Sequence, residues 1–122
     1  MIRIGITMGD PAGVGPELLL SAMDQLRSDG DLTLRAFAAP AILAQVADSL
    51  HLKLPSQIEA SSPLTADPIQ AGAYSTAGGQ AQLACLRAGA AALAQGAIDA
   101  LVTGPLHKRA IMASGKAGPG PS

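Results

Sequence analysis

The chain has 122 residues, a formal net charge of −1 and 48% hydrophobic residues, with one phenylalanine, one tyrosine and no tryptophan. This apolar content suits one layered α/β domain, and the charge balance gives no basic patch for nucleic acid. The apolar runs are too short, or too interrupted by glycine, proline and charge, to cross a bilayer, and the first residues fit neither a secretory signal nor a transit peptide.

The first half of the chain predicts an alternation of strands and helices. The β-branched residues Ile2, Ile4 and Ile6 predict a strand that ends at a glycine-rich loop. An amphipathic helix is predicted at Glu17–Arg27, because Pro16 suits the first helical position and Glu17 suits the dipole of the first turn. Further along the chain we predict a strand at Leu32–Ala38, a helix at Pro40–Leu50 with His51 as its boundary residue, and a short strand within Leu52–Ile58.

The second half predicts an excursion and then two more helices around a strand. Residues 61–72 are rich in turn-forming residues, which indicates a departure from the main sheet. The following elements are an Ala-rich helix at Gln80–Gln95 closed by Gly96, a buried strand at Ala100–Val102 and a helix at His107–Ala113. This alternation predicts an α/β fold with a mainly parallel sheet and helices on both faces. We expect an incomplete N-terminal α/β domain at residues 1–114 and an unstructured tail at residues 115–122.

The single cysteine, Cys85, lies in the apolar run of the Ala-rich helix. One thiol cannot build an intrachain disulfide framework, and this fits a reducing, cytoplasmic compartment. We expect Cys85 to be a small buried hydrophobic residue rather than a reactive thiol.

The loop Thr7–Pro16 follows the first strand and opens the first helix. Backbone N–H groups at such a helix start can face an anion, and Asp10 can supply a site carboxylate. The glycines do not match the dinucleotide-binding fingerprint in register, and no Lys-Ser/Thr pair follows them as in a P-loop. The alternative is a purely structural tight turn, in which Asp10 is a turn-forming residue before a proline.

The segment Val102–Lys108 follows a second strand. Ligands of doubly wound sheets bind at the carboxyl ends of strands, where Thr103, His107 and Lys108 are expected. His107 can act in acid–base chemistry, and Lys108 can neutralise a phosphate or carboxylate. Alternatively, Thr103 caps the next helix and Lys108 is a solvated first-turn residue, although the helix dipole disfavours a cation there.

Residues 72–79 form either a contact loop or a helix lead-in. The spacing indicates no metal cluster and no Ser-His-Asp arrangement.

Three segments follow one another in a recognisable order: Ile6–Glu17, the G-x-x-S-x-x-x-G stretch Gly72–Gly79, and the A-x-x-T-x-P-x-x-K block Ala100–Lys108. Together they resemble the 4-hydroxythreonine-4-phosphate dehydrogenase family of vitamin B6 (pyridoxal phosphate) synthesis. The resemblance implies oxidation of 4-phosphohydroxy-L-threonine by NAD or NADP, with a divalent metal (Zn, Mg or Co) polarising the hydroxyl, followed by decarboxylation. It also implies a cytoplasmic homodimer whose α/β/α domains are like those of the isocitrate and isopropylmalate dehydrogenases.

The chain departs from this family near its end. Where the family carries Gly-His-Thr-Glu, the chain reads Gly120-Pro121-Ser122, so that Pro121 replaces the histidine and Ser122 stands at the threonine position. The family's metal-ligating histidines, its cofactor-binding segment and its C-terminal substrate-binding residues lie beyond Ser122, and Ala77-Gly78 replaces a common Glu-Asn. We therefore expect an inactive N-terminal portion with no catalytic, cofactor or metal residues, whose substrate-binding candidates are Ser122, Lys108, His107, Thr103 and Asp10.

Other functions stay open beside this one. Relatives of the family also include dehydrogenases of 4-phosphorylated threonate or erythronate and of aromatic cis-dihydrodiol dicarboxylates, and the three segments do not separate these substrates. The chain can also be a non-catalytic module, in which the Gly9–Pro16 loop and Lys108 hold an anion. A third alternative is a pairing protein that docks another chain along an exposed sheet edge.

Overall fold

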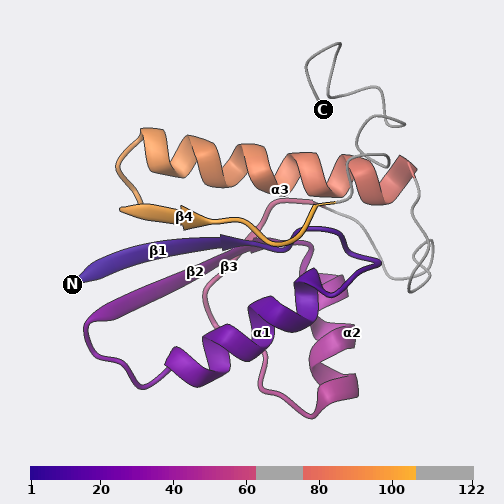
Figure 1. Cartoon of the computed structure of the whole chain (residues 1–122), viewed down its shortest axis with the longest axis horizontal. Helices are drawn as coiled ribbons and strands as arrows, with labels where there is room; N and C mark the ends of the chain where they lie inside the picture. Colours follow the sequence, from indigo (N-terminus) through magenta and orange to yellow (C-terminus); the bar gives the residue numbers. More distant parts are fainter. Residues whose placement is uncertain (63–75, 107–122) are drawn as a thin grey trace.

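The computed structural model describes residues 1–62 and 76–106. The strands β1 (Ile2–Thr7), β2 (Leu32–Ala38), β3 (Ile58–Ala60) and β4 (Ala100–Val102) form one sheet (Figure 1). The described helices are α1 (Gly15–Leu26), α2 (Pro40–Leu50) and α3 (Thr76–Ala94). Neighbouring strands are parallel throughout the order β3-β2-β1-β4, so the predicted α/β fold class is confirmed.

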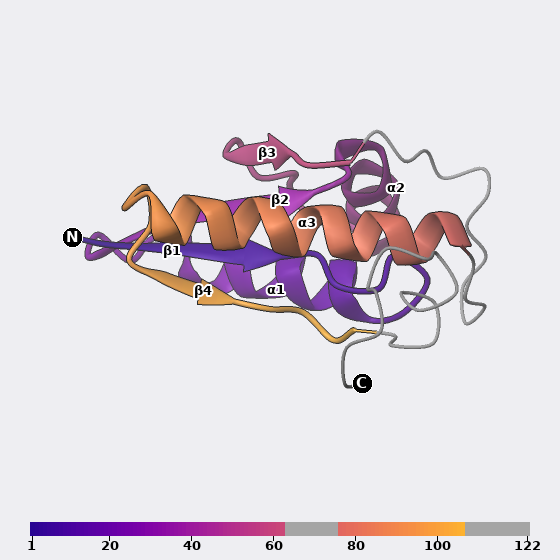
Figure 2. The same cartoon turned by 90° about the horizontal axis from the view of Figure 1, so that it is seen from above.

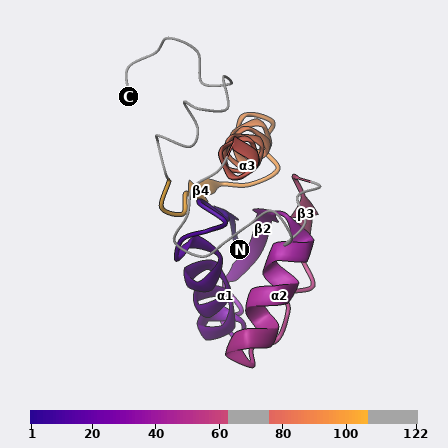
Figure 3. The ribbon, with the colours of Figure 1, turned by 90° about the vertical axis from the view of Figure 1, so that its right-hand side faces the viewer.

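The sheet is the middle layer of three. Helices α1 and α2 lie together against one face, and α3 is the one described helix against the other (Figure 3). Seen from above, α3 runs lengthwise over the sheet (Figure 2), and it contacts β1, β2 and β4. The expectation of helices on both faces is therefore met. Among the described residues, no helix combines the length and apolarity that crossing a membrane requires.

The chain extends the sheet from β1 in two opposite directions. After α1 and α2 it adds β2 and β3 on one side of β1, and after α3 it adds β4 on the other side. In register, Ile4 of β1 therefore pairs with Leu34 of β2 on one side and with Ala100 of β4 on the other. Open α/β sheets bind ligands beside such a reversal, just outside the carboxyl ends of the strands.

Most predicted element boundaries agree with the structure, but β3 lies at the end of the expected stretch. In the segment before it, the Leu52 amide donates to the Ala47 carbonyl in closing α2 and Pro55 has no N–H, so neither residue has an amide to donate to β2. The ladder with β2 begins only at Ile58, which pairs with Ala36. Pairing with the neighbouring strand, rather than local residue preference, decided this boundary.

The Ala-rich helix α3 begins at Thr76, four residues before the predicted start at Gln80. Gly78 and Gly79 are buried in its first turns, so tertiary packing outweighs their helix penalty of about 1 kcal/mol each. Most of the predicted excursion, together with the predicted helix at 107–113 and the predicted tail at 115–122, lies outside the described residues.

Two helices end on a residue in the left-handed conformation. Gly96, with φ 78°, closes α3 and confirms its predicted role as a cap. His51, with φ 56°, closes α2, which confirms that it is a boundary residue. After both helices, successive amides donate back to carbonyls of the last turn, the pattern of a Schellman motif. Because His51 has a side chain, this conformation costs it about 1–2 kcal/mol relative to glycine.

The larger hydrophobic core joins α1 and α2 to the sheet, and a smaller cluster of Phe37, Ala92 and Ile98 lies beneath α3. Cys85 belongs to the larger core and is fully buried. Burial raises the pKa of its thiol to about 12, because the thiolate would lose its hydration. The prediction that Cys85 is a buried hydrophobic residue is confirmed.

Candidate functional site

The candidate site lies at the carboxyl ends of β1 and β4, where the order of the sheet reverses. Two loops meet there, residues 8–14 after β1 and residues 103–106 after β4. Both loops belong to segments for which the sequence predicted ligand contacts, Thr7–Pro16 and Val102–Lys108. The fold therefore brings together two motifs that lie about ninety residues apart along the chain.

Three backbone-amide hydrogen bonds join the end of β1 and the loop after it to the loop after β4. The Gly104 amide donates to the Thr7 carbonyl at 3.2 Å and to the Thr7 hydroxyl at 3.1 Å. The Asp10 amide donates to the Pro105 carbonyl at 2.8 Å. We call this set of contacts the β1–β4 clasp. It fixes the path of the chain at the point where it leaves β4.

Two glycines make the clasp sterically feasible. Gly9 has φ 74°, and a Cβ atom placed there would lie 2.5 Å from the Pro105 carbonyl oxygen. A Cβ atom on Gly104 would lie 2.8 Å from the Thr7 carbonyl oxygen. Both obstacles are backbone atoms, which cannot rotate away as a side chain can. Any side chain at these positions forces the loops apart.

Asp10 shapes the loop after β1. Its Oδ1 atom accepts a hydrogen bond from the Ala12 amide at 3.0 Å, and its backbone carbonyl accepts one from the Gly13 amide at 3.1 Å. These are the contacts of a turn-forming aspartate. Two of the amides that could have faced a bound anion are therefore committed within the loop, and Pro16 at the start of α1 has none to offer. A contact between Asp10 and substrate stays a prediction.

The other substrate-binding candidates follow β4. Thr103 is exposed directly after the strand, and no hydrogen bond of its hydroxyl is found within residues 1–62 and 76–106. His107, Lys108 and Ser122 lie outside the described residues, as does the Gly72–Ser75 part of the G-x-x-S-x-x-x-G stretch. Ala77 and Gly78, where the family commonly has Glu-Asn, lie in the first turns of α3.

Sequence analysis did not single out Thr7, although this residue is central to the clasp. It is 1% exposed, and its hydroxyl and carbonyl oxygens both accept from Gly104. One signal was available in the sequence: Thr7 is a polar residue at the end of an otherwise aliphatic strand, where its hydroxyl can reach a neighbouring loop. Its partner, however, can be identified only from the tertiary structure.

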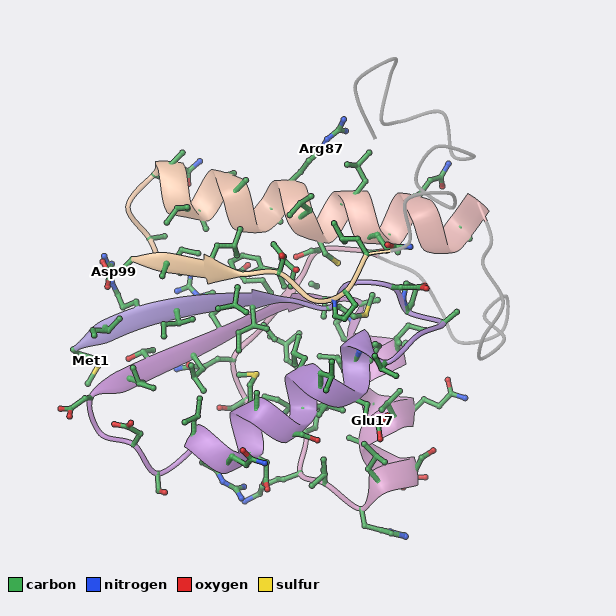
Figure 4. The ribbon with its side chains drawn as sticks, in the orientation of Figure 1. Met1, Glu17, Arg87 and Asp99 are labelled. Atoms are coloured by element: carbon green, nitrogen blue, oxygen red, sulfur yellow. The ribbon has the colours of Figure 1, made fainter. Side chains whose placement is uncertain are left out.

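The clearest ion pair lies at the opposite, amino edge of the sheet. Arg3 Nη2 lies 2.9 Å from Asp99 Oδ1, and the Arg3 backbone amide also donates to this carboxylate. Chiefly through its side-chain hydrogen bond, Arg3 lowers the pKa of Asp99 to about 2. Figure 4 places Asp99 near Met1, at the end of the molecule away from Glu17 in the first turn of α1. This pair joins β1 to the start of β4 and lies remote from the candidate site.

No cluster of three His, Cys, Asp or Glu side chains suited to a metal ion is present among the described residues. The carboxylate of Asp10 is engaged in its own turn, and the raised pKa of Cys85 keeps its thiol protonated. Metal ligation requires a deprotonated donor that is free to coordinate. Cys85 therefore offers no thiolate ligand, and Asp10 has one of its carboxylate oxygens committed to its own turn.

The parallel sheet, the reversed strand order and the joined strand-end loops define a doubly wound α/β protein, and ligands of such sheets bind at the edge that here lies beside β1 and β4. The family described as pyridoxal phosphate biosynthetic protein PdxA matches residues 12–121. The chain belongs to this family.

Known relatives agree with this assignment. The 4-hydroxythreonine-4-phosphate dehydrogenase of Xanthomonas axonopodis pv. citri is 38% identical over 123 residues, which cover 92% of this chain and 38% of that protein. The Vibrio cholerae enzyme of the same name is 35% identical over 130 residues, covering 94% of this chain and 38% of its own length. The solved terephthalate 1,2-cis-dihydrodiol dehydrogenase of Burkholderia xenovorans has a TM-score of 0.80 at 27% identity, over 98% of this chain and 38% of its own. The chain thus spans about 38% of the length of these relatives.

Proposed function

We propose that this chain is the N-terminal part of a cytoplasmic, homodimeric dehydrogenase of pyridoxal phosphate biosynthesis. The complete enzyme would oxidise 4-phosphohydroxy-L-threonine with NAD or NADP and a divalent metal, and decarboxylation would follow. The observation that supports this most is the family match over residues 12–121, which includes the end of the first strand-end loop, residues 12–14, and all of the second. The relatives from Xanthomonas and Vibrio carry the name of this activity.

In this proposal the chain contributes a substrate-facing edge rather than the reacting groups. Thr103, His107, Lys108 and Ser122 would contact the phosphorylated hydroxy acid. The β1–β4 clasp supports this role, because it fixes the path of the chain directly before His107 and Lys108. Asp10 would act mainly by shaping the facing loop.

The metal ligands and the nucleotide site would come from the remainder of the enzyme. The described residues offer no donor set for a metal ion. We therefore assign no chemical step to this chain alone. We expect that the isolated chain does not reduce NAD⁺ or NADP⁺ with 4-phosphohydroxy-L-threonine, whether Zn²⁺, Mg²⁺ or Co²⁺ is added.

A chimera tests the proposal. This chain would replace the matched part of the Xanthomonas enzyme, whose remaining sequence stays constant, and NADH formation would be followed by absorbance. We expect the chimera to be active and the isolated chain to be inactive. A chimera that is folded and dimeric but lacks activity on every substrate tested would contradict the proposal, as would activity of the isolated chain.

The same chimera separates the candidate substrates. It would be assayed with 4-phosphohydroxy-L-threonine, 4-phospho-D-threonate, 4-phospho-D-erythronate and the cis-dihydrodiol of terephthalate. Because the rest of the enzyme is constant, a change in substrate preference relative to the parent enzyme originates in this chain. Retained preference for 4-phosphohydroxy-L-threonine is the expected result. A switch to another substrate would support the corresponding alternative.

A second candidate function is pairing with another copy of this chain along β4. Within the described residues, β4 pairs with β1 only, and Ala100–Val102 carries no charge or proline that would discourage edge pairing. The sequence predicted a buried strand here, but Ala100 and Val102 are exposed, Val102 to 52%. Light scattering after gel filtration should show a dimer that Val102→Lys converts to a monomer. A wild-type chain that stays monomeric at high concentration would exclude this function.

A further inference from the structure

A groove at the amino edge of the sheet is unused by the proposed dehydrogenase function. It lies between the last turn of α1, the first residues of β2 and the segment 53–57 that leads into β3. Its volume is about 430 Å³, within the usual range for sites that hold small molecules. Since ligands of parallel sheets bind at the carboxyl edge, this groove lies away from the family's expected substrate edge.

The exposed leucines in the groove's lining come from two separate elements, α1 and the segment before β3. Leu26 of α1 is 39% exposed, and Leu54 in the segment before β3 is 42% exposed. Both line this one groove, and the nearly buried Met23 and Leu34 line it as well. Exposed leucines scattered singly over a surface need no explanation, but two that converge on one concavity offer an apolar ligand a place to exclude water.

The charged residues that line the groove, Asp24, Arg27 and Lys53, carry a net charge of +1. Arg27 Nη2 bonds to Asp24 Oδ1 at 2.7 Å, so these two lining residues largely neutralise each other. Lys53 also lines the groove, and no carboxylate of the described residues forms an ion pair with it. Ser56 and Gln57 of the same segment also line the groove and have a hydroxyl and an amide group. An ammonium group and hydrogen-bonding groups in the lining of one groove are suited to a carboxylate.

We propose that this groove binds a short-chain aliphatic monocarboxylate. The carboxylate would lie against Lys53, and its hydrocarbon chain would cover Leu26 and Leu54. The inference follows from the pairing of one unmatched cation with two converging leucines. It does not depend on dehydrogenase activity.

Amide chemical shifts of the ¹⁵N-labelled chain provide the test. The probe is 4-methylpentanoate, titrated to about 20 mM at constant ionic strength, because an exposed site with one charge contact is expected to bind in the millimolar range. We expect saturable shifts confined to the residues that line the groove, in the ranges 23–27, 32–34 and 53–57, apart from Pro55, which has no amide proton. Absent, unsaturable or scattered shifts would overturn the proposal.

Two comparisons separate the charged and apolar contributions. The alcohol 4-methylpentan-1-ol keeps the hydrocarbon chain, and acetate keeps the carboxylate. Each should bind about fivefold or more weakly than 4-methylpentanoate, since each loses one of the two contacts. Equal binding of the alcohol would refute the role of Lys53, and equal binding of acetate would refute that of the leucines.

Matched variants complete the experiment. Lys53→Gln and Leu54→Ser alter exposed side chains, and each should weaken the binding of 4-methylpentanoate by about fivefold. Arg35→Gln removes an equal charge from an exposed ion pair with Glu59 outside the groove, and it should leave the affinity unchanged. Equal affinity of Lys53→Gln and the wild-type chain, or equal weakening by Arg35→Gln, would overturn the proposal.

Discussion

Replacing Gly9 by alanine tests whether backbone contact between the two strand-end loops stabilises this fold. At this position φ is 74°, and the new Cβ atom would lie 2.5 Å from the Pro105 carbonyl oxygen. The left-handed conformation costs alanine about 1–2 kcal/mol. Overpacking against fixed neighbours costs about 1–3 kcal/mol more. We therefore expect Gly9→Ala to lower the free energy of unfolding by about 2–5 kcal/mol, a large part of a typical domain's stability.

Three other glycines separate the two causes. Gly96 has φ 78° and nothing within 4 Å of an added Cβ, so Gly96→Ala should show only the conformational cost of about 1–2 kcal/mol. Gly104→Ala meets the Thr7 carbonyl oxygen at 2.8 Å and should show only the steric cost of about 1–3 kcal/mol. Gly30 meets nothing within 4 Å, and Gly30→Ala should be neutral or stabilising by up to about 1 kcal/mol.

Urea unfolding followed by circular dichroism measures all four variants. The slope of the free energy against urea concentration should stay constant, so that midpoint shifts report stability. The Gly9 variant should be the least stable, and the Gly30 variant should match or exceed the wild-type chain. If Gly9→Ala costs no more than Gly96→Ala, the contact with the β4 loop contributes nothing and the steric argument is wrong. If Gly30→Ala is equally damaging, alanine substitution itself is the cause.

Three further predictions concern single side chains. His51→Gly should raise the free energy of unfolding by about 1 kcal/mol in the same urea assay, because it relieves the left-handed conformation at the end of α2; a loss would show that the histidine side chain contributes contacts of its own. Cys85 should resist a thiol reagent at mildly alkaline pH until the chain is unfolded, since its pKa is raised to about 12, and rapid labelling of the native chain would refute its burial. The folded state lowers the pKa of Asp99 to about 2, so the stability that Asp99 contributes is present above its ordinary pKa of 3.8 and is lost as the pH falls toward 2. In Asp99→Asn, the free energy of unfolding should therefore fall less steeply between about pH 4 and pH 2. An unchanged fall would show that the exposed pair with Arg3 does not stabilise the fold.

Several features of this protein are determined locally and could be predicted from the sequence. The apolar periodicity and the positions of glycine and proline gave the type and order of the elements, including the bounds of α2 and the cap at Gly96. Order and spacing of short motifs indicated the family that the comparisons confirm. These features depend on neighbouring residues along the chain, where sequence and structure are directly linked.

The tertiary structure alone decided how the strand ends meet. Alternating strands and helices predict a parallel sheet, but not that β4 returns to the free side of β1. That return brings Gly104 against Thr7, although the two are 97 residues apart. The sequence left the role of Asp10 open, and the structure shows its carboxylate closing a turn. Contacts between distant segments depend on the strand order, so the β1–β4 clasp exists only once β4 has paired with β1.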